Sequence, residues 1–100
     1  MPSGYKIQWS VRALADLENI IDYLKRNWTE REVRNFAKRL DKRLKLIAEN
    51  PRLFPMTRKR VNVRKSVLTK HTVIYYQANN TSVIVISLFD PRQSPKKLNI

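Results

Sequence analysis

The strongest constraint on the fold is a pair of amphipathic helical patterns in the first half of the chain, the second of which ends at a proline. In the first pattern, from Val11 to about Asn27, apolar residues recur at steps of three and four, as they do along one face of a helix. These residues are Ala13, Leu17, Ile20, Ile21, Leu24 and Trp28. Ser10 stands immediately before the pattern and is the expected N-cap.

The second helical pattern has a start and an end that can both be located. Thr29 followed three residues later by Glu32 is a capping box, so a helix is expected to begin there. Asn50-Pro51 ends it, because proline lacks an N–H and disfavours helix at the preceding residue. The apolar positions between them are Val33, Phe36, Ala37, Leu40, Leu44, Ile47 and Ala48. Two antiparallel helices, each with one apolar face, therefore need another surface to cover them.

The rest of the chain predicts strands that can supply that surface. Tyr5–Trp9 alternates apolar and polar residues, which is typical of a short strand with one buried face. Residues 51–60 contain two prolines and predict a loop. Three strands are expected after it, over Val61–Leu68, His71–Gln77 and Ser82–Phe89. The last is apolar at nearly every position, as in a central strand covered on both sides, and residues 78–81 form a turn whose asparagines tolerate positive φ.

The order of elements is therefore β-α-α-β-β-β. It predicts an α+β fold in which a helical hairpin packs on one face of a small, twisted, mostly antiparallel sheet. The chain has 100 residues, a size typical of one domain, so residues 1–100 are expected to form a single domain.

Charge indicates which partners such a domain attracts. Lys and Arg number 21 against 8 Asp and Glu, giving a net charge of +13, and residues 50–89 contain no acidic residue. Such an excess attracts polyanions, either nucleic acid or an acidic protein. The second helix carries a basic stripe beside its apolar one, interpreted either as a solvated helix face or as an anion-binding ridge. The stripe consists of Arg31, Arg34, Lys38, Lys42 and Lys45.

Several functional classes are excluded by residues that the sequence lacks. It contains no cysteine, one histidine and one glycine, Gly4, which rules out disulfides, Cys-ligated zinc, Cys nucleophiles and glycine-rich phosphate loops. No metal and no cofactor are predicted. No apolar stretch is long enough to span a bilayer and no secretory signal opens the chain, so a cytoplasmic protein without a membrane partner is expected. The acidic residues Asp16, Glu18 and Asp22 are expected to face solvent.

The residues that remain for chemistry are basic and aromatic and fall on the sheet and its flanking segments. Cations can hold a phosphate and stabilise developing charge, while Tyr and His can stack on bases or transfer protons, so the set suits RNA. It comprises Arg58, Lys59, Arg60, Arg64, Lys65, Lys70, His71, Tyr75, Tyr76 and Arg92. Strand alternation predicts that His71 and Tyr75 point the same way. Of the two tyrosines, one is expected in the core and the other on the sheet surface.

The order and spacing of these residues resemble the RelE/ParE superfamily of toxins from type II toxin–antitoxin systems, over essentially the whole chain. The resemblance rests on Ile7-Gln-Trp-Ser10, on Ala13, Asp16, Leu17, Ile20 and Tyr23, on Phe36, Leu40, Leu44 and Ile47, on Asn50-Pro51, Val63-Arg64 and Val73-Ile-Tyr75, and on the apolar last strand. It implies a small bacterial toxin, of a kind associated with plasmid stabilisation, that is neutralised by an acidic antitoxin encoded beside it.

The superfamily divides by target. RelE-like members cut mRNA on the ribosome, whereas ParE-like members inhibit DNA gyrase and are not nucleases. On the nuclease interpretation the catalytic residues are Arg64, His71, Tyr75 and Arg92. Residues expected to contact nucleic acid or the target are Arg58, Lys59, Arg60, Lys65, Lys70, Lys96 and Lys97.

No Tyr or His follows Arg92, where a RelE-like enzyme carries one, and the early pattern from Ala13 to Tyr23 favours the ParE-like side. The alternatives are a RelE-like mRNA endonuclease and a non-catalytic nucleic-acid-binding module.

Overall fold

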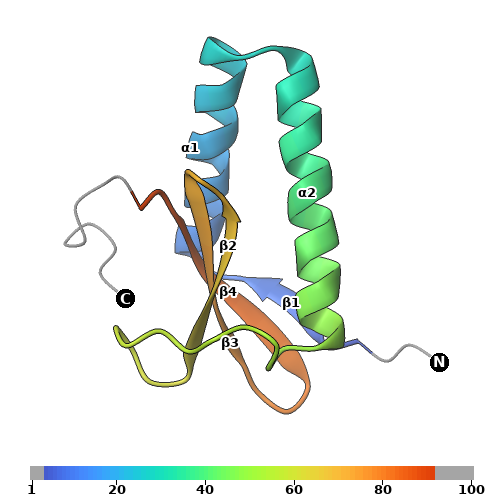
Figure 1. The fold of residues 1–100 in the computed structure, drawn as a ribbon, viewed down its shortest axis with the longest axis vertical. Coiled ribbons are helices and arrows are strands. Elements are labelled where there is room, and N and C mark those ends of the chain that lie inside the picture. The colour runs from blue at the N-terminus through green and yellow to red at the C-terminus, as the bar shows by residue number, and fades with distance from the viewer. Residues whose placement is uncertain (1–3, 92–100) are drawn as a thin grey trace.

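The computed structural model describes residues 4–91, which form a two-layer α+β fold. Its elements are β1 (Lys6–Trp9), α1 (Val11–Asn27), α2 (Glu30–Glu49), β2 (Val63–Thr69), β3 (Thr72–Ala78) and β4 (Ser82–Phe89). The strands form one sheet in the order β1-β4-β3-β2, in which β1 runs parallel to β4 and the other neighbours are antiparallel. Both helices lie on one face of the sheet, and the hairpin they form extends beyond the strands (Figure 1). The predicted fold class, element order and interior position of the last strand are confirmed.

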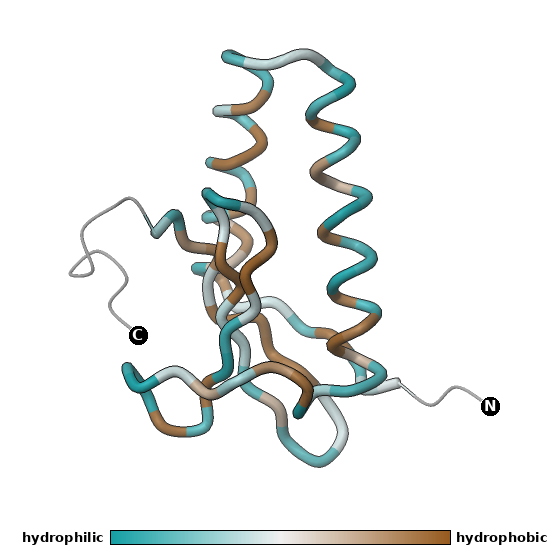
Figure 2. The backbone as a smooth tube through the Cα atoms, viewed as in Figure 1, coloured by the Kyte–Doolittle hydropathy of each residue, from teal (hydrophilic) through white to brown (hydrophobic). Residues whose placement is uncertain are grey.

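The predicted helix starts are confirmed at the level of atoms. The Ser10 hydroxyl accepts a hydrogen bond from the Ala13 N–H at 3.0 Å, and the Thr29 hydroxyl accepts one from the Glu32 N–H at 3.4 Å. The main core lies between the helices and the sheet, and hydrophobic colouring gathers in the central strands (Figure 2). Its buried members are Ala13, Leu40, Ile47, Leu68, Ile74, Tyr76, Val83, Val85 and Leu88. No helix within residues 4–91 is both long and apolar enough to cross a membrane.

The strand predicted over Val61–Leu68 begins two residues later and ends one residue later. Val61 is 82% exposed, and Asn62 has a φ of 65°, a left-handed conformation that asparagine tolerates better than most residues and that breaks the strand. Thr69 pairs with Thr72 across a two-residue turn. His71 therefore belongs to this turn and is not the first residue of β3, as the sequence pattern predicted.

Asp16 corrects the expectation that the acidic residues of α1 all face solvent. Its carboxylate accepts hydrogen bonds from the Ser87 hydroxyl at 2.8 Å and from the Leu88 N–H at 3.1 Å. Strand β1 pairs with β4 only as far as Val85. The Ser10 hydroxyl donates to the Ile86 carbonyl at 2.8 Å, just where the register of β4 against β3 shifts. Side chains of α1 and its cap thus satisfy the part of the β4 edge that β1 leaves unpaired.

The turn between β3 and β4 forms where it was predicted, but by another mechanism. The Asn79 side-chain oxygen accepts the N–H groups of Thr81 and Ser82 at 2.9 and 2.7 Å, which is an Asx turn. Positive φ is confined to Asn62 among the non-glycine residues of the described chain.

Candidate functional site

Arg64 anchors the loop that connects α2 to β2. Its guanidinium donates to the carbonyl of Phe54 at 2.7 Å and, more weakly, to that of Arg52 at 3.4 Å. Tyr76, directly opposite Arg64 in the sheet, donates its hydroxyl to the Pro51 carbonyl at 2.7 Å. The loop contains prolines and approaches the core, so these carbonyls need donors from the sheet. A mid-strand arginine therefore has a structural reason here, which the sequence pattern did not reveal.

A small polar hollow of about 170 Å³ lies next to Arg64. It is lined in part by Arg52, Asn62, Asn79 and Asn80. Two guanidinium groups and several amides are suited to hold an anion such as a phosphate.

Tyr76 is fully buried beside Arg64, as expected for one of the two tyrosines. Burial raises the pKa of its phenol, and the nearby positive charge of Arg64 opposes part of that increase. The phenol is therefore protonated at neutral pH, which makes it a poor general base.

Tyr75 is buried as well, with 6% of its surface exposed, so the expectation that one of the two tyrosines lies on the sheet surface is wrong. It lies opposite Lys65 in the sheet, on the face away from the helices, and packs in a small cluster with Val63, Val73 and Phe89. Burial raises the pKa of its hydroxyl as well. Because side chains alternate along a strand, Tyr75 and Tyr76 point to opposite faces, and Tyr75 points away from Arg64.

His71 occupies the turn between β2 and β3, where its N–H bonds to the Thr69 hydroxyl at 3.1 Å. Thr69 lies five positions after Arg64 in β2, which is about 17 Å at roughly 3.3 Å per residue. His71 therefore lies at the opposite end of the strand pair from Arg64. It lines a groove beside the helices, whereas Tyr75 packs on the other face, so the predicted common direction of His71 and Tyr75 is wrong.

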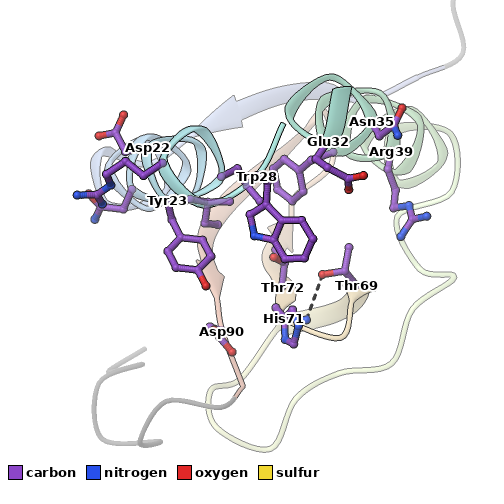
Figure 3. Close-up of a pocket in the computed structure, with 15 residues that line it drawn as sticks. Asp22, Tyr23, Trp28, Glu32, Asn35, Arg39, Thr69, His71, Thr72 and Asp90 are labelled. Carbon is purple, nitrogen blue, oxygen red and sulfur yellow. Dashed lines mark hydrogen bonds between the residues drawn. The ribbon is translucent and has the colours of Figure 1, made fainter. Parts of the chain in front are cut away.

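The groove next to His71 is the larger hollow, with a volume of about 790 Å³ between the helical hairpin, the β2–β3 turn and the end of β4. Tyr23 and Trp28 project from the hairpin toward His71 and Asp90 (Figure 3). They are 49% and 54% exposed, so large aromatic surfaces face an open space, a feature typical of protein interfaces.

The groove was missed because Trp28 continues the helical spacing of the apolar stripe in α1. Trp28 is in fact the C-cap, with extended backbone at φ −135° and ψ 172°, so its side chain leaves the buried face. The tryptophan directly before the capping residue Thr29 was the available clue, since such a position lies at the end of a hairpin, beyond the reach of a short sheet.

The remaining predicted cations fall in separate places. Arg58–Arg60 are exposed on the loop before β2, Lys65 is exposed within β2, and Lys70 is exposed in the turn at its far end. The predicted residues Arg92, Lys96 and Lys97 lie outside the described residues. Within residues 4–91, no three His, Cys, Asp or Glu side chains are placed to bind one metal ion.

The fold has counterparts among solved structures. The structure of the chromosomal ParDE system from P. aeruginosa is similar to this chain, with a TM-score of 0.73 at 12% identity over 88% of this chain and 97% of that one. The structure of the isolated E. coli RelE toxin has a TM-score of 0.62 at 20% identity and covers 94% of this chain and 92% of that one. A chain of the E. coli DinJ-YafQ toxin–antitoxin complex has a TM-score of 0.62 at 12% identity, covering 87% of this chain and 92% of that one. At 12–20% identity, these likenesses show a shared fold.

The model of one protein family matches most of the chain. The family described as the ParE toxin of type II toxin-antitoxin system, parDE, matches residues 7–95. The chain belongs to this family and is a toxin of a type II toxin–antitoxin system. No curated protein sequence matches it.

Proposed function

We propose that the toxin acts as ParE-like proteins do, by binding and inhibiting DNA gyrase, and that it does not cut RNA. The observation that carries this proposal is the dispersal of the candidate catalytic residues. Arg64 holds loop carbonyls on the helix-covered face, Tyr75 is buried on the other face, and His71 lies in the distant turn.

RNA cleavage requires a base, an acid and a phosphate-stabilising cation around one scissile bond, within hydrogen-bond reach of the reacting atoms. The described residues do not provide that arrangement. An inhibitor that works by binding needs only a complementary surface, and membership of the ParE family supports the same target.

A RelE-like endonuclease remains the second candidate, and the polar hollow beside Arg64 favours it. Arg52 and Arg64 both line this hollow, and the exposed cations Arg58–Arg60 and Lys65 belong to neighbouring segments. Arg92 would have to complete the site from beyond the described residues. The non-catalytic nucleic-acid-binding module is the third candidate and is supported by the net charge of +13.

An acidic antitoxin is the proposed regulatory partner. The ParDE and DinJ-YafQ structures are of toxin–antitoxin systems, and the positive charge of this chain complements an acidic protein. The groove beside Tyr23 and Trp28 offers the exposed aromatic surface on which such a partner can anchor.

Two assays on the same purified protein test the proposed mechanism. In a DNA supercoiling reaction, the protein should inhibit gyrase, and His71→Gln and Tyr75→Phe should inhibit as well as the unmodified chain. In a cell-free translation reaction, the mRNA should show no new 5′ ends.

Ribosome-dependent cuts that disappear in the His71→Gln or Tyr75→Phe variant would overturn the proposal in favour of the endonuclease. A protein that binds nucleic acid but neither inhibits gyrase nor cleaves mRNA would favour the binding module. Thermal unfolding of each variant controls for loss of fold.

A further inference from the structure

We propose that the outward face of α2 binds the phosphate backbone of nucleic acid and that its ligand is duplex DNA. This surface, the α2 stripe, consists of Arg31, Arg34, Lys38, Lys42 and Lys45. The choice of DNA over RNA rests on the proposed action against gyrase. The proposal that this surface binds phosphate is independent of that action.

The α2 stripe is a continuous row of exposed cations. All five side chains are exposed, and neighbours in the row are three or four residues apart, which places them on one side of the helix. At the helical period, the row lies opposite Leu40 and Ile47, the buried residues of α2. Arg31 and Lys45 are fourteen positions apart in the sequence, which is about 21 Å along the helix at about 1.5 Å per residue.

Most of this charge is not neutralised within the molecule. Lys45 pairs with Asp41 at 3.2 Å. The other four cations of the stripe form no hydrogen bond or ion pair in the part of the chain that the structure describes. The acidic residues Glu30 and Glu32 lie in the first turn of α2 and Glu49 lies at its end, so Asp41 is the acidic residue in the middle of the helix.

The composition of the stripe favours nucleic acid over an acidic protein. Protein interfaces depend on aromatic and apolar anchors at their centre, and none of the five residues of the α2 stripe is aromatic or apolar. Such anchors lie instead in the groove at Tyr23 and Trp28. Phosphate contacts need only cations, and about 21 Å spans roughly six phosphates of one DNA strand at about 3.4 Å each.

The test measures how salt weakens binding to a labelled 20-base-pair DNA duplex, by fluorescence anisotropy between 50 and 200 mM NaCl. The variant Arg34→Gln/Lys38→Gln removes two cations from the stripe. The matched control Lys6→Gln/Lys25→Gln removes two exposed cations from β1 and α1, so that both variants have the same net charge. Arg34→Lys/Lys38→Arg keeps the charge of the stripe and controls for side-chain identity.

Each lost phosphate contact lowers the slope of log K against log salt by about 0.9. The stripe variant should therefore have a slope shallower by about 1.8, so that between 50 and 200 mM the unmodified protein loses about twelvefold more affinity than the variant does. The matched control and the charge-keeping variant should follow the unmodified protein.

Equal slopes for the stripe variant and the matched control would overturn the proposal, because binding would then follow net charge alone. Polyglutamate that displaces the duplex at equal charge concentration would overturn it in favour of an acidic protein. Tighter binding of a single-stranded RNA of equal length would overturn duplex DNA as the ligand. If the protein binds DNA through the stripe but leaves gyrase active, the proposed function is refuted, whereas the proposed DNA-binding surface is not.

Discussion

Replacing Asp16 by alanine should destabilise the fold far more than its place on a helix surface suggests. The Asp16 carboxylate accepts from the Ser87 hydroxyl and the Leu88 N–H. Ser87 and Leu88 are themselves buried, so neither donor readily finds another partner when the carboxylate is removed. The loss falls on β4, which contacts β1, β3 and α1 and so connects most of the fold.

The size of the effect follows from the two hydrogen bonds. A bond to a charged acceptor contributes about 1.5–3 kcal/mol, so two of them set an upper limit of about 3–6 kcal/mol. The Asp16 side chain is partly exposed, and water can replace part of what is lost. We expect Asp16→Ala to lower the free energy of unfolding by about 2–4 kcal/mol, a large share of the 5–15 kcal/mol typical of a domain.

Urea unfolding measures this loss directly. With a slope of about 1.5 kcal/mol/M, the midpoint should fall by about 1.3–2.7 M. Glu18→Ala removes an exposed carboxylate from the same helix and should change stability by less than about 0.5 kcal/mol. Adding Ser87→Ala to Asp16→Ala should cost less than the sum of the two single changes, because they share a contact. A midpoint for Asp16→Ala no lower than that of Glu18→Ala would refute the reasoning.

Three further predictions concern the core, the groove and pH. Leu40→Ala should lower the free energy of unfolding by about 2–5 kcal/mol in urea, because Leu40 is buried. Leu46→Ala, at a 40% exposed position, should lower it by less than about 1 kcal/mol. Equal losses would mean that the buried face of α2 is assigned wrongly. Trp28→Ala should leave the unfolding midpoint nearly unchanged but weaken binding of the adjacent-gene antitoxin about 30-fold in calorimetry, as loss of an aromatic anchor does; unchanged affinity would remove the groove from that interface. Burial raises the folded-state pKa of Tyr76, so the stability that its neutral phenol contributes is present below about pH 10 and is lost as the pH rises further. The free energy of unfolding of Tyr76→Phe should therefore fall less steeply above about pH 10 than that of the unmodified protein. Identical pH dependence of the two proteins would contradict this.

The helical hairpin could be predicted because local chemistry determines it. Ser10 and Thr29 cap the helices, and a proline follows the second one, so the bounds depend on neighbouring residues alone. The interior position of β4 was also predictable, since a strand of almost uninterrupted apolar residues needs cover on both faces. The parallel pairing of β1 with β4 and the anchoring of the β4 edge by Asp16 depend on contacts about 70 residues apart in the chain, which no local pattern encodes.

The candidate site was less predictable because it depends on strand register. The shift of the β2–β3 turn to Lys70-His71 took His71 out of the strand, and a prediction based on alternation then failed for His71 and Tyr75. Arg64 was placed among the candidate catalytic residues, but its bonds to the loop carbonyls depend on the folded position of Phe54, which no local pattern encodes. Trp28 kept the helical spacing and gave no sign in the periodicity that its backbone leaves the helix.

The most direct test of the proposed mechanism is a DNA supercoiling reaction with purified gyrase and increasing amounts of the purified toxin, with and without its antitoxin. We predict that the toxin inhibits supercoiling and that the antitoxin restores it. Full gyrase activity at all toxin concentrations, together with ribosome-dependent mRNA cleavage by the same preparation, would contradict the account.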